Sequence, residues 1–240
     1  MKKTHFCVLF EGRTGSSMLG GILNQNRGIS FLGEEAGTLC SNGWCAQRRW
    51  IETLFERPQE LNDRRFQHES RAIGFKIKLR ETADRRSFRA CLEHFQVKII
   101  HMTRKNLVKQ VVSSIRAMAL YKRTGLYNLR ADEHEHLMPS RSAIAVQEFD
   151  RVLRWIGSSN SQLECFVASL QQPVLGVSYE ELIGDTKGCV ARVCDYLVVP
   201  KHDFRVPTLK VSNDDLRDCI ENYDELRAAY ASSTIAAMFE

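Results

Sequence analysis

A glycine-rich turn near the start of the chain combines hydroxyl and cationic side chains in a pattern that could bind an anion. Residues 5–10, HFCVLF, form a short apolar run typical of a strand that is covered on both faces of a parallel sheet. The turn that follows contains Gly12 and Gly15, and helical spacing of apolar residues begins at Met18. Such a junction directs backbone N–H groups and the positive end of the helix dipole at one point. The sequence therefore predicts a phosphate or sulfate site at this turn.

Two other interpretations of the turn stay open from the residues alone. Hydroxyl caps are common where a helix begins, so Thr14, Ser16 and Ser17 could serve only to form the turn. A nucleotide kinase would need the pattern G-x-x-x-x-G-K-[ST], in which the lysine reaches the nucleotide phosphates. No lysine follows Gly15, and the only cation in the turn is Arg13. The kinase interpretation is therefore the weaker of the two.

A second group of cations stands where a predicted strand at residues 97–102 gives way to a predicted helix. Arg104 and Lys105 follow the strand, and apolar residues then recur at helical spacing. A helix dipole disfavours cations at its N-terminus by about 0.3 to 1 kcal/mol each, so an anion bound there would explain the pair. Ser113 falls on the opposite, polar face and, judged from this helix alone, is an exposed hydroxyl.

Two adjacent carboxylates, Glu34 and Glu35, follow a short predicted strand at residues 29–32. In open α/β sheets the carboxyl ends of the strands face the ligand crevice, so either carboxylate could be a general base. Solvation at the surface or capping of a helix would explain the pair equally well.

The other predicted elements alternate between strands and helices along the chain. Further strands are expected at residues 74–79 and 174–177, and helices at 84–95, 140–170, 187–197 and 215–230. The strand at 74–79 alternates apolar and basic residues, which indicates a less buried face near the sheet edge or the ligand. The alternation of β and α units favours an α/β fold in which helices cover both faces of one parallel sheet.

Composition indicates an ordinary globular protein. The chain has 240 residues, 43% of them hydrophobic and 26% charged, which is consistent with one domain over residues 1–240. No apolar run is long enough for a transmembrane helix, and a cytoplasmic location is the default. A net charge of +5 is too small to predict nucleic-acid binding. Residues 121–139 break the helical pattern and are expected to form a lid over the active site.

A metal site is not expected from the cysteine and histidine residues. The eight cysteines include no Cys-x-x-Cys pair and are expected to be buried thiols. The run at residues 132–136, DEHEH, mixes carboxylates and imidazoles in an apparent loop, which gives no fixed ligand geometry.

Several separate segments together resemble one family. The turn at residues 13–17, RTGSS, resembles the 5′-phosphosulfate loop of sulfotransferases that use 3′-phosphoadenosine 5′-phosphosulfate. Residues 104–113 look like the 3′-phosphate motif of that family. Residues 177–182, VSYEEL, and 220–226, IENYDEL, are similar to segments of bacterial carbohydrate sulfotransferases of the trehalose and nodulation-factor type. The resemblance implies a P-loop-like three-layer sandwich, with a parallel sheet of four or five strands flanked by helices.

The resemblance also implies how the donor is bound. The 5′-phosphosulfate would lie against the backbone of residues 14–17, with Ser17 hydrogen-bonding the 5′-phosphate and Arg13 standing where many relatives have a lysine. The 3′-phosphate would be held by Ser113 together with Arg104 or Lys105. The family's spacing between the basic residue and the serine is met by Lys105, whereas the guanidinium group of Arg104 is chemically better suited to bind a phosphate.

Relatives of the trehalose type use a glutamate just after the second strand as general base, whereas cytosolic sulfotransferases use a histidine. This points to Glu34 or Glu35, with Glu35 slightly favoured. Lys210, before the last helix, would close over the donor. No metal is expected to take part in the reaction.

The resulting expectation is transfer of a sulfuryl group to a hydroxyl of a carbohydrate or glycolipid. A P-loop-like nucleotide kinase and a non-catalytic domain that binds a sulfated or phosphorylated partner are the alternatives. The expected partner is a small-molecule or glycolipid acceptor, without nucleic acid, and a homodimer stays open.

Overall fold

The computed structural model describes residues 3–66, 69–129, 137, 141–207 and 215–240. The chain divides into two compact units. The first unit comprises Met1–Thr103 and Ser161–Val206, and the second comprises Arg104–Asn160 and Pro207–Glu240. The prediction of a single domain over residues 1–240 stays a prediction.

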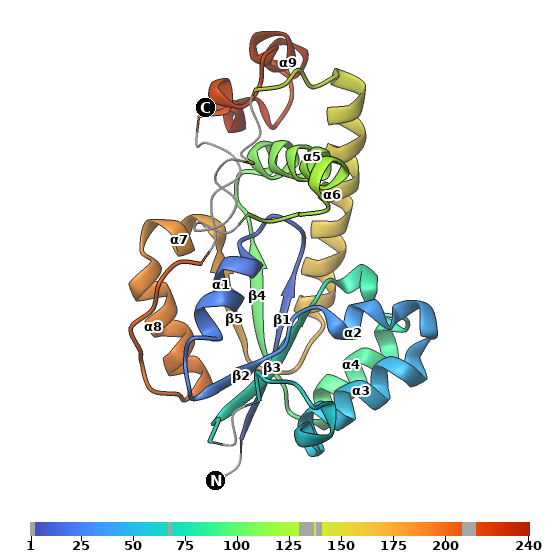
Figure 1. Ribbon diagram of the computed structural model, residues 1–240. Helices are drawn as coiled ribbons and strands as arrows, with labels where there is room; N and C mark the ends of the chain where they lie inside the picture. Colours follow the sequence, from blue (N-terminus) through green and yellow to red (C-terminus); the bar gives the residue numbers. More distant parts are fainter. Residues whose placement is uncertain (1–2, 67–68, 130–136, 138–140, 208–214) are drawn as a thin grey trace. The chain divides into compact units, whose positions relative to one another are not determined.

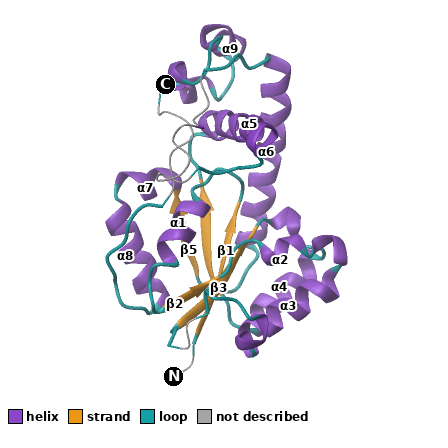
Figure 2. Ribbon diagram, viewed as in Figure 1, coloured by secondary structure: helices purple, strands orange, loops and turns teal. Residues whose placement is uncertain are grey.

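The first unit is built on a five-stranded parallel sheet, with the strand order β2-β3-β1-β4-β5 (Figures 1 and 2). The strands are β1 (Thr4–Phe10), β2 (Ile29–Phe31), β3 (Ala72–Ile77), β4 (Lys98–Thr103) and β5 (Val174–Ser178). All four neighbouring pairs are parallel. This confirms the predicted α/β class and the predicted parallel sheet.

The strand order reverses at β1. The chain forms β2 and β3 on one side of β1 and then β4 and β5 on the other side. In open α/β sheets, ligands bind beyond the carboxyl ends of the strands where the order reverses. The turn that leaves β1 after Phe10 therefore lies at the position where a ligand is expected.

Alternate residues of β1 supply two separate hydrophobic cores, one on each face of the sheet. On one face, Phe6 and Val8 pack with the buried side chains of α1 (Ser16–Leu23) and α8 (Thr186–Leu197). On the other face, Cys7 and Leu9 pack with α3 (Trp44–Glu56), α4 (Arg85–His94) and the end of α6 (Val146–Ala168). Figure 1 shows α1 and α8 on one side of the strands and α3 and α4 on the other. The first unit therefore has three layers.

The prediction of a less buried face on β3 is wrong, and so is a position at the sheet edge; the alternative, a position near the ligand, stays a prediction. All six residues of Ala72–Ile77 are buried, and β3 pairs with β2 on one side and with β1 on the other. The lysine that suggested an exposed face, Lys76, is only 8% exposed. A lysine can occupy such a position when its long stem packs against apolar groups and its ammonium group finds polar partners.

Five short elements complete the described part of the first unit. These are α2 (Glu35–Thr38), η1 (Cys40–Asn42), η2 (Pro58–Leu61), η3 (Leu79–Glu81) and α7 (Tyr179–Gly184). Gln47 joins two of them, because its Nε2 donates to the carbonyl oxygens of Ala36 at 2.9 Å and Glu81 at 2.6 Å. Gln47 is 1% exposed, so this side chain fixes α2 against η3 from within the core.

The second unit has a helical core of its own. Its helices are α5 (Leu107–Thr124), the first part of α6 and α9 (Tyr223–Ala229), with the short turns η5 (Leu216–Asp218) and η6 (Ala236–Phe239). Val108, Val111 and Val112 of α5 pack with Phe149 of α6 and Leu226 of α9. These valines recur at helical spacing, as the sequence predicted.

Several predicted boundaries differ from the structure. The helix expected at residues 140–170 is α6, and it continues without interruption through Gly157. The helix expected at 215–230 is instead η5 followed by α9. The lid expected at 121–139 begins as the last turn of α5, and its residues 130–136, 138 and 139 lie outside the described residues. Within the described ranges, no helix combines the length and apolar character needed to cross a membrane.

Candidate functional site

The turn after β1 has an unusual backbone conformation. Arg13 and Gly15 both have positive φ, at 67° and 83°. For a residue such as Arg13 this conformation costs about 1 kcal/mol or more, and such residues are concentrated at ligand sites. Thr14 is 1% exposed and donates from Oγ1 to the carbonyl oxygen of Glu11 at 2.8 Å. This buried hydrogen bond therefore fixes the backbone conformation of the turn.

The first turn of α1 has the features of an anion site. Its N-cap is Gly15, and no described side chain caps it. The first N–H groups of an α-helix have no partner within the helix, and the helix dipole adds a partial positive charge there. A phosphate or sulfate group would accept hydrogen bonds from these N–H groups and be attracted by the partial positive charge. The residues concerned are those that the sequence predicted, Thr14 to Ser17.

Tyr179 and Leu182 of α7 pack against the turn. A Cβ atom added at Gly15 would lie 3.0 Å from Cδ2 of Tyr179 and 3.2 Å from Cδ2 of Leu182. α7 begins with a capping box, in which Ser178 and Glu181 bond each other's backbone N–H at 3.2 and 2.9 Å. The segment VSYEEL therefore supports the turn and leaves little room for a side chain at residue 15.

Lys76 of β3 connects the turn to the first of the two predicted carboxylates. Its Nζ lies 3.3 Å from Oγ of Ser17 and 3.0 Å from Oε1 of Glu34. The Lys76 side chain is 10% exposed, and its ammonium group lies 5.2 Å from the centre of the Phe10 ring. The alternating basic residues of this strand indicated a position near the sheet edge or the ligand, but the sequence could not show which distant residues Lys76 meets.

Glu34 is held by a second lysine as well. Lys78 pairs with Oε2 of Glu34 and also with Oε1 of Glu81, the latter at 2.9 Å. Burial opposes ionisation of Glu34, but Lys76 and Lys78 outweigh it and hold the pKa of Glu34 below its ordinary value. Burial also lowers the pKa of Lys78, but Glu34 and Glu81 outweigh that effect and raise it. Both members of the Glu34–Lys78 pair are therefore stabilised in their charged forms.

Glu35 has different partners from its neighbour. Its Oε1 lies 2.5 Å from Nη2 of Arg65, which also binds Asp63. Within the described residues, no ion pair joins Glu35 to Lys76 or Lys78. The two adjacent carboxylates thus belong to separate groups of charges.

Glu11 is a further carboxylate at the turn that sequence reasoning missed. It directly follows β1, is 4% exposed and pairs with Nη1 of Arg80 on η3. Burial raises the pKa of Glu11, and the nearby Arg80 offsets this only in part. An acidic residue at the end of a buried apolar strand, before a glycine, was the signal that could have found it.

The predicted 3′-phosphate residues belong to the second unit. Arg104 and Lys105 directly follow the last residue of β4. Asn106 caps α5, because its Oδ1 accepts from the N–H of Lys109 at 2.8 Å. Ser113 is 4% exposed, so the expectation that it is an exposed hydroxyl on a polar face is wrong. Lys210 lies outside the described residues.

The described part of the chain contains no cluster of three or more His, Cys, Asp or Glu side chains that could hold a metal ion. The run at residues 132–136 lies outside the described residues.

Comparison with known families decides what kind of protein this is. A family model described as Stf0 sulphotransferase matches residues 77–225, which is more than half of the chain. The chain belongs to the Stf0 sulphotransferase family. The predicted resemblance and the predicted enzyme class, a sulfotransferase, are thereby confirmed.

Two curated relatives of this sulfotransferase align with nearly its whole length. Nodulation protein H of Rhizobium meliloti (strain 1021) is 24% identical over 98% of this chain and 94% of its own. Nodulation protein H of Rhizobium tropici is 25% identical over 98% of this chain and 92% of its own. These alignments include the turn after β1, which precedes the segment matched by the family model.

A solved structure shows the same fold. The crystal structure of a sulfotransferase from Alicyclobacillus acidocaldarius superposes with a TM-score of 0.52, at 17% identity, and the match covers 100% of this chain and 95% of that one. The predicted P-loop-like α/β sandwich is therefore confirmed.

Proposed function

We propose that this sulfotransferase moves a sulfuryl group from 3′-phosphoadenosine 5′-phosphosulfate to a hydroxyl group of a carbohydrate or glycolipid. The observation that carries the proposal is the start of α1, where no described side chain caps the helix and Lys76 stands beside Ser17. This end of the helix, together with a buried ammonium group, fits a doubly charged phosphosulfate.

The family resemblance supplies the donor contacts of this proposal. Backbone N–H groups of Thr14 to Ser17 bind the 5′-phosphosulfate in this proposal, and Ser17 hydrogen-bonds it. Arg13 neutralises charge on the leaving phosphate oxygen. As the family resemblance implies, Arg104 or Lys105 with Ser113 binds the 3′-phosphate, and Lys210 closes over the donor.

We assign the general base to Glu34. Among the described residues it is the carboxylate whose partner, Lys76, also contacts the donor turn. In the reaction, the acceptor hydroxyl gives its proton to Glu34 while its oxygen forms a bond to sulfur. The bond from sulfur to the 5′-phosphate oxygen breaks, and its electron pair leaves with adenosine 3′,5′-bisphosphate. This in-line displacement follows the logic of phosphoryl transfer.

Two contributions should dominate the rate enhancement: the general base and the groups that stabilise negative charge on the leaving phosphate. A positioned base contributes on the order of 10² to 10⁴ in rate. Removing one donor that stabilises developing negative charge costs roughly 3 to 4 kcal/mol in a well-studied enzyme. The cations and N–H groups of the turn therefore matter as much as Glu34.

The acceptor class is supported by the relatives. Both are named nodulation protein H, and the resemblance noted in the sequence is to carbohydrate sulfotransferases of the nodulation-factor type. A hydroxyl on a sugar or a glycolipid is the acceptor that this relationship favours.

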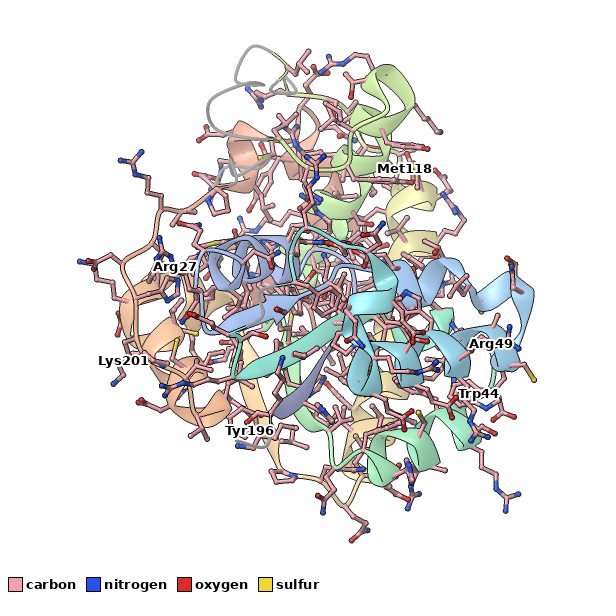
Figure 3. The ribbon with its side chains drawn as sticks, turned by 60° about the horizontal axis from the view of Figure 1, so that its bottom comes forward. Arg27, Trp44, Arg49, Met118, Tyr196 and Lys201 are labelled. Atoms are coloured by element: carbon pink, nitrogen blue, oxygen red, sulfur yellow. The ribbon has the colours of Figure 1, made fainter. Side chains whose placement is uncertain are left out.

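Donor binding and transfer test the proposal directly. Purified protein is given the ³⁵S-labelled donor and a panel of oligosaccharides and glycolipids, and binding of adenosine 3′,5′-bisphosphate is measured by calorimetry. Arg13→Ala and Ser17→Ala should each weaken donor binding at least tenfold. Arg49→Ala is the matched control, because Arg49 lies on the exposed surface of α3 (Figure 3). Normal binding by both turn variants would show that the donor does not bind there.

A further inference from the structure

Three polar groups from separate parts of the first unit form a continuous chain of contacts. Ser17 belongs to the first turn of α1, Lys76 to β3 and Glu34 to the residues after β2. Lys76 Nζ lies between the other two, 3.3 Å from Ser17 Oγ and 3.0 Å from Glu34 Oε1. The same ammonium group therefore touches both the donor turn and the proposed base.

The two lysines that hold Glu34 differ in their other contacts. Lys78 pairs with Oε2 of Glu34 and is also fixed by Glu81, whose carbonyl oxygen accepts from the buried Gln47 at 2.6 Å. Lys76 pairs with the other oxygen, Oε1, and it also contacts Ser17 of the turn. An anion bound at the turn would therefore compete for Lys76 and leave the Glu34–Lys78 pair in place.

A carboxylate that is paired through both oxygens is poorly suited to accept a proton. Each ammonium group occupies lone pairs that the acceptor hydroxyl would need, and each favours the ionised form of Glu34. The base assigned above is thus restrained in the arrangement that the structure shows.

We propose that Lys76 couples donor binding to the base: phosphosulfate bound at the turn draws the Lys76 ammonium away from Glu34 Oε1, and that oxygen then accepts the proton of the acceptor hydroxyl. This inference rests on the proposed function. It makes Lys76 a positioning residue for Glu34 and predicts that the base becomes effective only when the donor is in place.

The exchange is feasible because Lys76 keeps a partner throughout. Its side chain is 10% exposed, so leaving the ammonium group unpaired would be costly, whereas exchanging a carboxylate for a phosphosulfate oxygen keeps a charge-assisted hydrogen bond. The Phe10 ring lies 5.2 Å from Nζ and favours a cation there. The ammonium group needs only a small movement, because it already lies within 3.3 Å of Ser17 Oγ.

The other charges around Glu34 are already paired with one another. Lys78 of β3 is held by Glu81 of η3, and Glu11 after β1 is held by Arg80 of η3. Glu35 is bound by Arg65. Movement of Lys76 therefore acts chiefly on Glu34.

Carboxyl ¹³C NMR of the glutamate-labelled protein tests the coupling. The Glu34 resonance is assigned by its loss in Glu34→Gln, and its titration is followed with and without 3′-phosphoadenosine 5′-phosphosulfate. In the wild-type protein, the donor should raise the pKa of Glu34. In Lys76→Met the donor should leave the pKa of Glu34 unchanged, whereas Lys76→Arg should restore the donor-dependent rise.

Lys201→Met is the matched control for loss of a lysine. Lys201 belongs to the first unit, is 60% exposed and pairs with Asp195 at the surface (Figure 3). This variant should show the same donor-dependent rise as the wild-type protein. Kinetics give a second test, because Lys76→Met should lower kcat as well as raise KM for the donor, with a loss of roughly 10- to 100-fold in kcat/KM.

The outcomes separate this inference from the proposed function. If wild-type protein binds the donor and transfers sulfate but the pKa of Glu34 does not rise, coupling through Lys76 is wrong and the proposed function stands. A donor-dependent rise that persists in Lys76→Met would also overturn the coupling. Failure of the wild-type protein to bind the donor would overturn both.

Discussion

The ring of Tyr179 lies against Gly15, so close that a Cβ atom at residue 15 would be 3.0 Å from its Cδ2. The two residues are joined only by folding, since Tyr179 begins α7 after the last strand of the sheet and Gly15 follows the first. Gly15 also has a φ of 83°, which a side chain disfavours. Contact and backbone conformation thus both require glycine at this position.

Gly15→Ala should therefore lose stability and donor binding together. A left-handed alanine costs about 1 to 2 kcal/mol, which corresponds to a fall of a few degrees in Tm for a chain of this size. Displacement of the turn should also weaken binding of adenosine 3′,5′-bisphosphate at least tenfold. Thermal unfolding and calorimetry measure the two effects.

Gly12→Ala provides the control for that substitution within the same turn. No described atom lies within 4 Å of a Cβ atom added at Gly12. Its Tm and its binding of adenosine 3′,5′-bisphosphate should stay near the wild-type values. Equal losses in both variants would contradict the importance of the Tyr179 contact.

The two adjacent carboxylates should respond differently to neutralisation. Glu34→Gln should lower kcat on the order of 10² or more, because the proposed general base is lost, while binding of the bisphosphate product stays intact. Glu35→Gln should retain most activity, because Glu35 is bound to Arg65 instead of Lys76. Steady-state transfer of labelled sulfate measures both. The reverse pattern would make Glu35 the base.

The sequence was sufficient to predict the elements that depend on local patterns. The apolar run of β1, the glycines after it and the spacing of Leu19 and Ile22 gave the strand, turn and helix at the correct positions. The valines of α5 likewise predicted its buried face. These patterns follow from the periods of strands and helices, which any single segment contains.

The sequence could not show the contacts that link distant segments. Lys76 meets Glu34 and Ser17 only because β3 lies between β2 and β1, an order that no single segment encodes. Its basic side chain suggested an exposed strand face, whereas the lysine is buried and paired. Glu11 was missed for the same reason, because its partner Arg80 is 69 residues away.

Glu34 should make stability depend on pH. Its pKa in the folded protein lies below the ordinary value of 4.5, so its ion pairs stabilise the fold above that value. This contribution is lost as the pH falls through the folded-state pKa. The difference in free energy of unfolding between the wild-type protein and Glu34→Gln should therefore be largest near neutral pH and shrink on acidification. Urea unfolding at several pH values measures it, and a difference that grows on acidification would contradict the ion pairs.

The buried pair of Glu11 and Arg80 should show strong coupling. Arg80→Met leaves the Glu11 carboxylate buried without its main cation, and because Arg80 is itself one-third exposed we expect a loss of about 2 kcal/mol. Glu11→Gln combined with Arg80→Met should recover part of that loss, since no buried charge is left without its partner. Urea unfolding of the single and double variants gives the coupling energy. Additive losses would show that the two side chains contribute independently.

The proposed 3′-phosphate contact can be tested by comparing two nucleotides. Adenosine 3′,5′-bisphosphate and adenosine 5′-monophosphate differ only in the 3′-phosphate, so the ratio of their Kd values isolates its contacts. A charged hydrogen bond is worth about 1.5 to 3 kcal/mol, so loss of the correct residue should reduce this ratio at least tenfold. Arg104→Ala and Lys105→Ala are compared, with Lys109→Ala as the control from the same helix. If only Lys105→Ala reduces the ratio, Lys105 binds the 3′-phosphate, as its spacing from Ser113 implies. If only Arg104→Ala does, Arg104 binds it, as the geometry of its guanidinium group favours. An unchanged ratio in both would show that neither residue binds the 3′-phosphate.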